Sequence, residues 1–181
     1  MKKVVGIALL VLVAAQTSPA QGIKFGVGVA GGIDIPVVQN DQGNGSIFGF
    51  KGRVKLISAI ALEPGVFFTK YGDPTNEDFT MDIEGSKLTS FGIDATLGSG
   101  FGGTGIRPYG VFGIGSYKMK RDQTQQDLSK FGWSAGFGIE IGVTAPISLD
   151  VRGKLVVIPT EGGGSKKSAT VTGGVNYYFG M

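Results

Sequence analysis

The amino-acid sequence predicts an all-β protein, an eight-stranded antiparallel up-and-down transmembrane β-barrel. Three observations support this fold class. Apolar residues recur at every second position in eight separate segments, and the connections between these segments alternate between short and long. Glycine contributes 33 of the 181 residues, more than twice its usual share of about 7%. The length suits a single domain.

The first twenty residues have the features of a secretory signal peptide. Two lysines follow the initiator methionine, an uncharged apolar stretch comes next, and a short polar stretch ends in Ala20. We expect cleavage after Ala20, which leaves a signal peptide over residues 1–20 and an outer-membrane β-barrel domain over residues 21–181. The alternative, a membrane-anchor helix, needs about 20 apolar residues, and this stretch is shorter.

The composition excludes several classes of function. The chain has no His and no Cys, so serine–histidine and cysteine–histidine catalysis, imidazole or thiolate metal sites and disulfides are absent. Without Lys2 and Lys3 of the leader, the 17 basic residues become 15, against 14 acidic ones. This balance leaves no basic surface for nucleic acid. We expect no enzymatic activity, no cofactor, no bound metal and no nucleic-acid partner.

The predicted strands alternate apolar side chains with small or charged ones. In the first strand, for example, Phe25 and Val27 alternate with Gly26 and Gly28. A period of two is typical of strands with one apolar face. The eight segments are residues 23–35, 48–56, 60–71, 89–97, 107–119, 131–141, 147–157 and 169–179.

The facing of the fifth segment stays open at this stage. Tyr109, Val111 and Tyr117 occupy odd positions, whereas Phe112 and Ile114 occupy even ones. Both faces are therefore apolar, and the alternation does not decide which of them points outward.

The connections alternate in length along the chain. Short ones lie at residues 57–59, 98–105 and 143–146, and longer polar ones at residues 36–47, 72–87, 120–130 and 158–167. In an antiparallel barrel this rhythm places all short turns at one end, together with both termini. The four long connections are then exposed loops at the other end.

Two barrel types fit eight alternating strands, and the composition of the polar face distinguishes them. A soluble lipocalin-like barrel exposes its polar face to water, where glycine only weakens a strand. Here the polar face is rich in glycine, as expected for a narrow lumen, and the apolar face suits lipid. We predict that aromatic side chains form two lipid-interface girdles: Tyr109, Tyr177 and Phe179 near one rim, and Tyr117, Phe131 and Trp133 near the other.

Charged residues on the inward face predict an ion-pair network in the lumen. Arg53 and Glu63 are equally far from the short turn near Ser58, so we expect them to be cross-strand partners. Glu140 and Asp150 lie at a similar depth beside another short turn. The alternative is that each charge is separately hydrated in a wet lumen. The predicted network comprises Lys51, Arg53, Lys55, Glu63, Asp94, Glu140, Asp150, Arg152 and Lys154.

Three short phrases give the chain a resemblance to a known superfamily. They are residues 62–68 (LEPGVFF), residues 107–110 (RPYG) and the aromatic-ended residues 174–179 (GVNYYF). With this architecture, the chain resembles the small eight-stranded outer-membrane barrels that include the OmpA membrane domain and OmpX. The first phrase is also similar to small barrels of Bacteroidetes-type genomes, including PorT relatives.

The resemblance implies a location and partners. Proteins of this superfamily lie in the outer membrane of Gram-negative bacteria, in contact with its lipid and lipopolysaccharide. The third phrase looks like the C-terminal strand that the barrel-assembly machinery recognises, although it continues to Gly180 and Met181. We expect a structural or surface-interaction role, with the barrel anchoring four exposed loops and charges plugging the lumen. The alternative is a narrow pore for ions or small solutes.

Overall fold

The computed structural model describes residues 24–37, 43–57, 59–72, 87–98, 103–121, 124–160 and 164–179. The expected signal peptide lies outside these residues. Among the residues described, no helix is long and apolar enough to cross a membrane. The strands are β1 (Lys24–Pro36), β2 (Gly45–Ile57), β3 (Ile60–Tyr71), β4 (Lys87–Gly98), β5 (Gly105–Arg121), β6 (Thr124–Gly142), β7 (Ile147–Pro159) and β8 (Ser165–Phe179).

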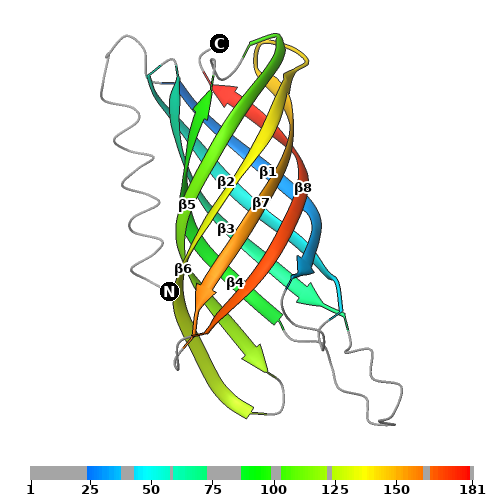
Figure 1. Ribbon diagram of the computed structural model, residues 1–181. Helices are drawn as coiled ribbons and strands as arrows, with labels where there is room; N and C mark the ends of the chain where they lie inside the picture. Colours follow the sequence, from blue (N-terminus) through cyan, green and yellow to red (C-terminus); the bar gives the residue numbers. More distant parts are fainter. Residues whose placement is uncertain are drawn as a thin grey trace.

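The eight strands form one closed antiparallel barrel. Each strand pairs with the next along the chain, and β8 pairs with β1 from Phe25↔Phe179 to Pro36↔Ser168 (Figure 1). The predicted fold class is therefore confirmed. Closure leaves no free sheet edge, which a barrel in lipid requires because hydrocarbon offers no partner for backbone polar groups.

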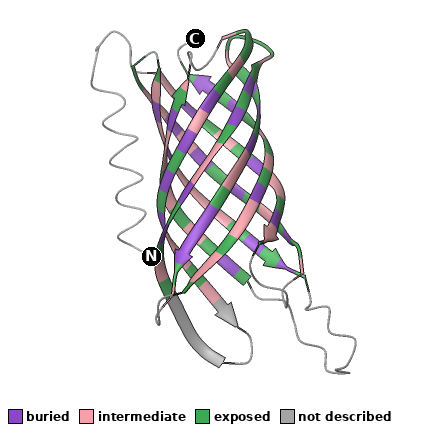
Figure 2. Ribbon diagram, viewed as in Figure 1, coloured by how far each residue is buried: buried purple, intermediate pink, exposed green. Residues whose placement is uncertain are grey.

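Side chains alternate between the lumen and the outer surface along each strand. In β1, Val27 and Val29 are 51% and 43% exposed, whereas the inward-facing Asp34 is 2% exposed. Figure 2 shows this alternation as buried and exposed bands along the strands. The outer surface is apolar and the lumen contains most of the buried charges, which is the reverse of a soluble barrel.

The structure corrects one predicted connection. We expected a long loop over residues 120–130, but β5 continues to Arg121 and β6 begins at Thr124, with these two residues in register. The pair extends beyond the neighbouring strands (Figure 1). Sequence periodicity missed this extension because a strand that leaves the lipid no longer needs an apolar face, so its polar residues resemble a loop.

Inward-facing glycines let neighbouring backbones approach closely around the narrow lumen. A Cβ atom on Gly136 of β6 would lie 2.0 Å from the carbonyl oxygen of Gly153 and 2.7 Å from Lys154 Cα. A Cβ atom on Gly153 itself, on the outer face of β7, would meet nothing within 4 Å. The high glycine content therefore has a steric cause at the inward positions.

This contrast predicts opposite outcomes for two similar substitutions. Gly136→Ala forces backbone atoms apart and should destabilise the barrel by about 1–3 kcal/mol. Gly153→Ala should leave stability unchanged or slightly raised, because alanine restricts the unfolded chain more than glycine does. Urea unfolding in lipid vesicles, followed through the fluorescence of Trp133, the chain's one tryptophan, measures both. Equal effects would contradict the steric explanation.

Candidate functional site

The candidate functional site is a layer of charged side chains across the lumen, near the end with the short turns. The layer draws on β2, β3, β4, β6 and β7, and six of its members are at most 7% exposed. Those six are Lys51, Arg53, Glu63, Glu140, Asp150 and Arg152. Asp94 and Lys154 complete it at its border, with side chains 13% and 17% exposed.

Arg53 of β2 is the centre of the layer. Its guanidinium forms ion pairs with Glu63 and Glu140 and a third with Asp150 Oδ2 at 3.2 Å. It also donates a hydrogen bond to the Tyr178 hydroxyl. β2 and β6 are four places apart in an eight-stranded ring, so the contact with Glu140 crosses the full diameter of the lumen.

Arg152 of β7 is a second centre. Its Nη2 atom lies 2.6 Å from Glu63 Oε2 and 3.3 Å from Asp150 Oδ2, and its Nη1 atom lies 3.0 Å from Asp94 Oδ2. Lys154 Nζ reaches the same Asp94 oxygen at 2.8 Å. Lys51 pairs with Asp150 and lies 3.6 Å from Glu63. The eight charges are thus linked into one connected network.

Two tyrosines fill the space between the charged groups. The Tyr109 hydroxyl donates to Asp150 and accepts a hydrogen bond from Arg152 Nε at 2.9 Å. The Tyr178 hydroxyl donates to Glu140 at 2.8 Å. The Arg53 guanidinium carbon lies 5.9 Å from each tyrosine ring centroid, within cation–π range. Rings and ion pairs together occupy this level of the lumen.

Lys55, the ninth predicted member, lies outside the network. It is half-buried at the rim, where it pairs in register with Lys24, and no ion pair between described residues includes it. Arg107 takes a border position that the sequence did not indicate, with Nη1 3.6 Å from Glu140 Oε1. Lys55 lies two residues nearer the rim than Arg53 on the same face of β2 and is partly exposed, so its charge needs no buried partner.

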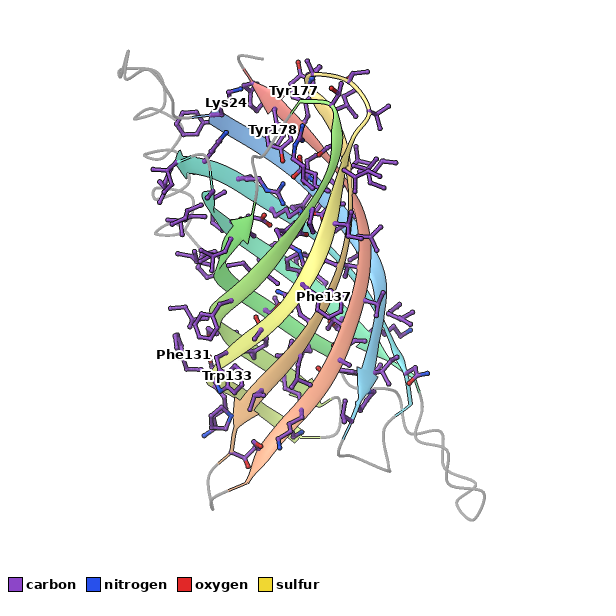
Figure 3. All side chains as sticks on the ribbon, turned by 45° about the horizontal axis from the view of Figure 1, so that its top comes forward. Lys24, Phe131, Trp133, Phe137, Tyr177 and Tyr178 are labelled. Carbon is purple, nitrogen blue, oxygen red and sulfur yellow. The ribbon has the colours of Figure 1, made fainter. Side chains whose placement is uncertain are left out.

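Four of the six predicted interface aromatics point outward. Tyr177 and Phe179 are 46% and 51% exposed and form an edge-to-face pair, with ring centroids 5.2 Å apart. Phe131 and Trp133 are 65% and 41% exposed. Figure 3 shows Phe131 and Trp133 toward one end of the barrel and Tyr177 toward the other.

The other two predictions, Tyr109 and Tyr117, are wrong. Tyr109 is 4% exposed inside the network, and Tyr117 lines the internal cavities beside Asp94 and Lys154. The outward face of β5 carries Phe112 and Ile114 instead. Sequence periodicity could not choose between two apolar faces, whereas the hydroxyl group of Tyr109 finds buried hydrogen-bond partners only on the inside.

Sequence reasoning also missed Tyr178, which contacts Arg53 and Glu140, and its neighbour Asn176. Both lie on the inward face of β8, and they are 2% and 1% exposed. The Asn176 amide donates to Ser148 Oγ at 3.3 Å. Both occupy even positions in β8, which lie on the face opposite to Tyr177 and Phe179. This alternation was the signal available in the sequence. Among the described residues, no group of three acidic side chains is arranged to hold a metal ion.

The architecture and its apolar outer surface match a known family. The family model for the outer membrane protein beta-barrel domain matches residues 6–179. The chain belongs to this family. No curated protein sequence matches it.

Solved structures of outer-membrane barrels share the fold of this family member. Neisserial surface protein A is 17% identical, with a TM-score of 0.67 over 87% of this chain and 99% of that one. The N-terminal barrel of Pseudomonas aeruginosa OprF is 17% identical, with a TM-score of 0.57 over 85% and 97%. Ail of Yersinia pestis is 15% identical, with a TM-score of 0.52 over 87% and 97%. At these sequence identities, the comparisons show that the chains share a fold.

The network predicts a steep stability cost at its centre. Arg53→Ala removes the cation that contacts Glu63, Glu140 and Asp150 together, and it should destabilise the barrel by about 3–5 kcal/mol. Arg53→Met combined with Glu140→Gln removes one charge of each sign and should cost less. Lys55→Ala, outside the network, is the matched control and should change stability by less than about 0.5 kcal/mol. Urea unfolding in vesicles measures all three, and equal costs for Arg53→Ala and Lys55→Ala would contradict the network.

Proposed function

We propose that this chain is a non-enzymatic outer-membrane barrel with a structural or surface-interaction role, whose lumen is plugged and whose long connections act outside the cell. The observation that carries the proposal is the ion-pair network across the lumen. Four basic and four acidic side chains pair there, with Arg107 at the border near Glu140, and burial favours such pairing over separate hydration. On this proposal, the long connections outside the cell carry the surface-interaction role.

Export and assembly follow from the same proposal. Residues 1–20 act as a cleaved signal peptide, and the barrel-assembly machinery recognises β8, which ends in Phe179. The apolar outer face contacts lipid, and the ends of the long connections face the lipopolysaccharide layer. Among structural relatives, Ail is described as an attachment invasion locus protein, and one of its structures contains the heparin analogue sucrose octasulfate. A surface-interaction role is compatible with that precedent.

The second candidate function is a narrow pore for ions or small solutes. It is supported by small cavities on the side of the network toward the long connections, one of them lined by Lys51, Arg152 and Lys154. A continuous water path past Arg53 and Arg152 would require their ion pairs to separate. We therefore place the plugged barrel first.

Conductance separates the two candidates. In planar bilayers, the purified wild-type barrel should show little or no steady conductance, because paired side chains occupy the lumen. Arg53→Ala should raise the conductance or the frequency of gating, whereas Lys55→Ala should behave like the wild type. Large stable wild-type channels would favour the pore, and this reading does not depend on whether Arg53→Ala folds.

The orientation is testable because the chain has no cysteine. Gly72→Cys lies at the end with long connections, and Thr144→Cys lies in a short turn; both positions are exposed. On intact cells, a membrane-impermeant maleimide should label Gly72→Cys and spare Thr144→Cys, and lysed cells should show labelling of both. Labelling of Thr144→Cys alone on intact cells would show that the short turns, and not the long connections, face the outside of the cell.

A further inference from the structure

Three basic side chains lie at the mouth of the lumen on the side of the short turns. Lys24 begins β1, Lys55 lies near the end of β2, and Arg107 lies near the start of β5. Figure 3 shows Lys24 at this end of the barrel. Each of the three lies two residues from a buried residue on the inward face of its strand, as Lys55 does from Arg53. Side chains two residues apart share a face, so all three cations face inward.

These cations are close together, and none has an acid of its own. Lys24 and Lys55 are directly opposite each other in the β1–β2 ladder, where like charges repel. Arg107 also lies close enough to repel Lys55. Among the described residues, no ion pair includes Lys24 or Lys55, and the acid that Arg107 approaches, at 3.6 Å, is Glu140. Glu140 is already the partner of Arg53.

The sequence provides no further acidic side chain near this mouth. The short turns over residues 58–59, 99–104 and 143–146 contain no Asp or Glu, and β8 contains none along its whole length. The mouth therefore has an excess of positive charge, whereas the layer behind it pairs its charges. An anion that enters from this end meets three cations before it reaches the network.

The positions of these cations favour binding of an anion. The Arg107 guanidinium is held by the preceding turn, because Nη1 donates to the Gly103 carbonyl oxygen at 3.2 Å and Nη2 donates to that of Thr104. A group that is already ordered loses little entropy when a ligand binds. The Arg107 side chain is 15% exposed, and Lys24 and Lys55 are half-buried. Water screens such charges less than it screens fully exposed ones.

We propose that this mouth of the lumen is a binding site for a phosphate group, held by Lys24, Lys55 and Arg107. A phosphate group has several acceptor oxygens, so it accepts hydrogen bonds from three strands at once, and Arg and Lys are common phosphate ligands. Its double negative charge suits three clustered cations better than a monovalent anion does. The inference goes beyond the plugged-barrel function and holds whether or not the lumen conducts. Soluble phosphate compounds and phospholipid headgroups share this chemistry.

The test is isothermal titration calorimetry on the full barrel refolded in uncharged detergent, at constant ionic strength. Inorganic phosphate should bind at millimolar concentration, and acetate should bind at least fivefold more weakly. Glycerol 3-phosphate and dihexanoylphosphatidylglycerol are titrated in parallel. Tighter binding of glycerol 3-phosphate assigns the site to soluble phosphate compounds, and tighter binding of the lipid assigns it to headgroups.

Variants locate the site. Lys55→Gln should weaken binding of inorganic phosphate about tenfold, because one charge-assisted hydrogen bond is lost. Lys55→Arg keeps the charge and should stay within about twofold of the wild type. Lys167→Gln is the matched control, since Lys167 is an exposed lysine near the start of β8, at the end with the long connections. It should leave phosphate binding unchanged.

Stability provides a second measurement that a merely structural role would not reproduce. Without phosphate, Lys55→Gln should be as stable as the wild type or slightly more stable, because the repulsion from Lys24 is removed. Phosphate should protect the wild type against urea and protect Lys55→Gln much less. Equal binding of acetate, unchanged binding by Lys55→Gln, an equal loss in Lys167→Gln or no phosphate binding at millimolar concentration would overturn the proposal.

Discussion

Closure of the sheet by pairing β1 with β8 is the constraint on which the rest of the structure depends. In hydrocarbon, every backbone donor and acceptor needs a partner within the protein, and a sheet meets this demand only as a closed ring. An eight-stranded ring is narrow. Closure therefore decides two things together: the outer surface must be apolar, and the inner side chains must share a small cross-section.

The narrow lumen explains why glycine and charge occur side by side on the inner face. Gly28 of β1 faces the network, and a Cβ atom there would lie 2.3 Å from Asn176 Oδ1 and 3.2 Å from Lys51 Cε. A Cβ atom on Gly138 would lie 2.4 Å from the Tyr109 hydroxyl oxygen. Small residues on some strands thus make room for long side chains from others. The network is possible because part of the wall has no side chains.

The lumen is divided along its length into regions of different chemistry. A layer of ion pairs and tyrosines lies near the short turns, and two small cavities lie between this layer and the long connections. The farther cavity is lined by apolar side chains such as Tyr71 and Leu88 together with Lys166 and Lys167. The ion-pair layer holds eight charged side chains in mutual contact, whereas Asp34, farther along the lumen, accepts a hydrogen bond from the Tyr71 hydroxyl.

Local periodicity determined the strands and most of the facing, because side chains in any strand alternate strictly. It placed Arg53 and Glu63 on one face at equal distance from a turn, and the two are in contact. Periodicity could not orient β5, where Tyr109 and Phe112 compete for the outer face. It also missed the continuation of β5 and β6 to Arg121 and Thr124, because polar residues outside the lipid have no apolar alternation.

Contacts across the lumen were decided by the tertiary structure alone. The pairing of Arg53 with Glu140 joins β2 to β6, and the sharing of Asp150 between Lys51 and Arg152 depends on how those side chains meet at one level. The stagger of the closed ring sets that level, and no short stretch of sequence encodes it. The sequence by itself determined which residues face inward, and closure of the barrel decided which of them meet.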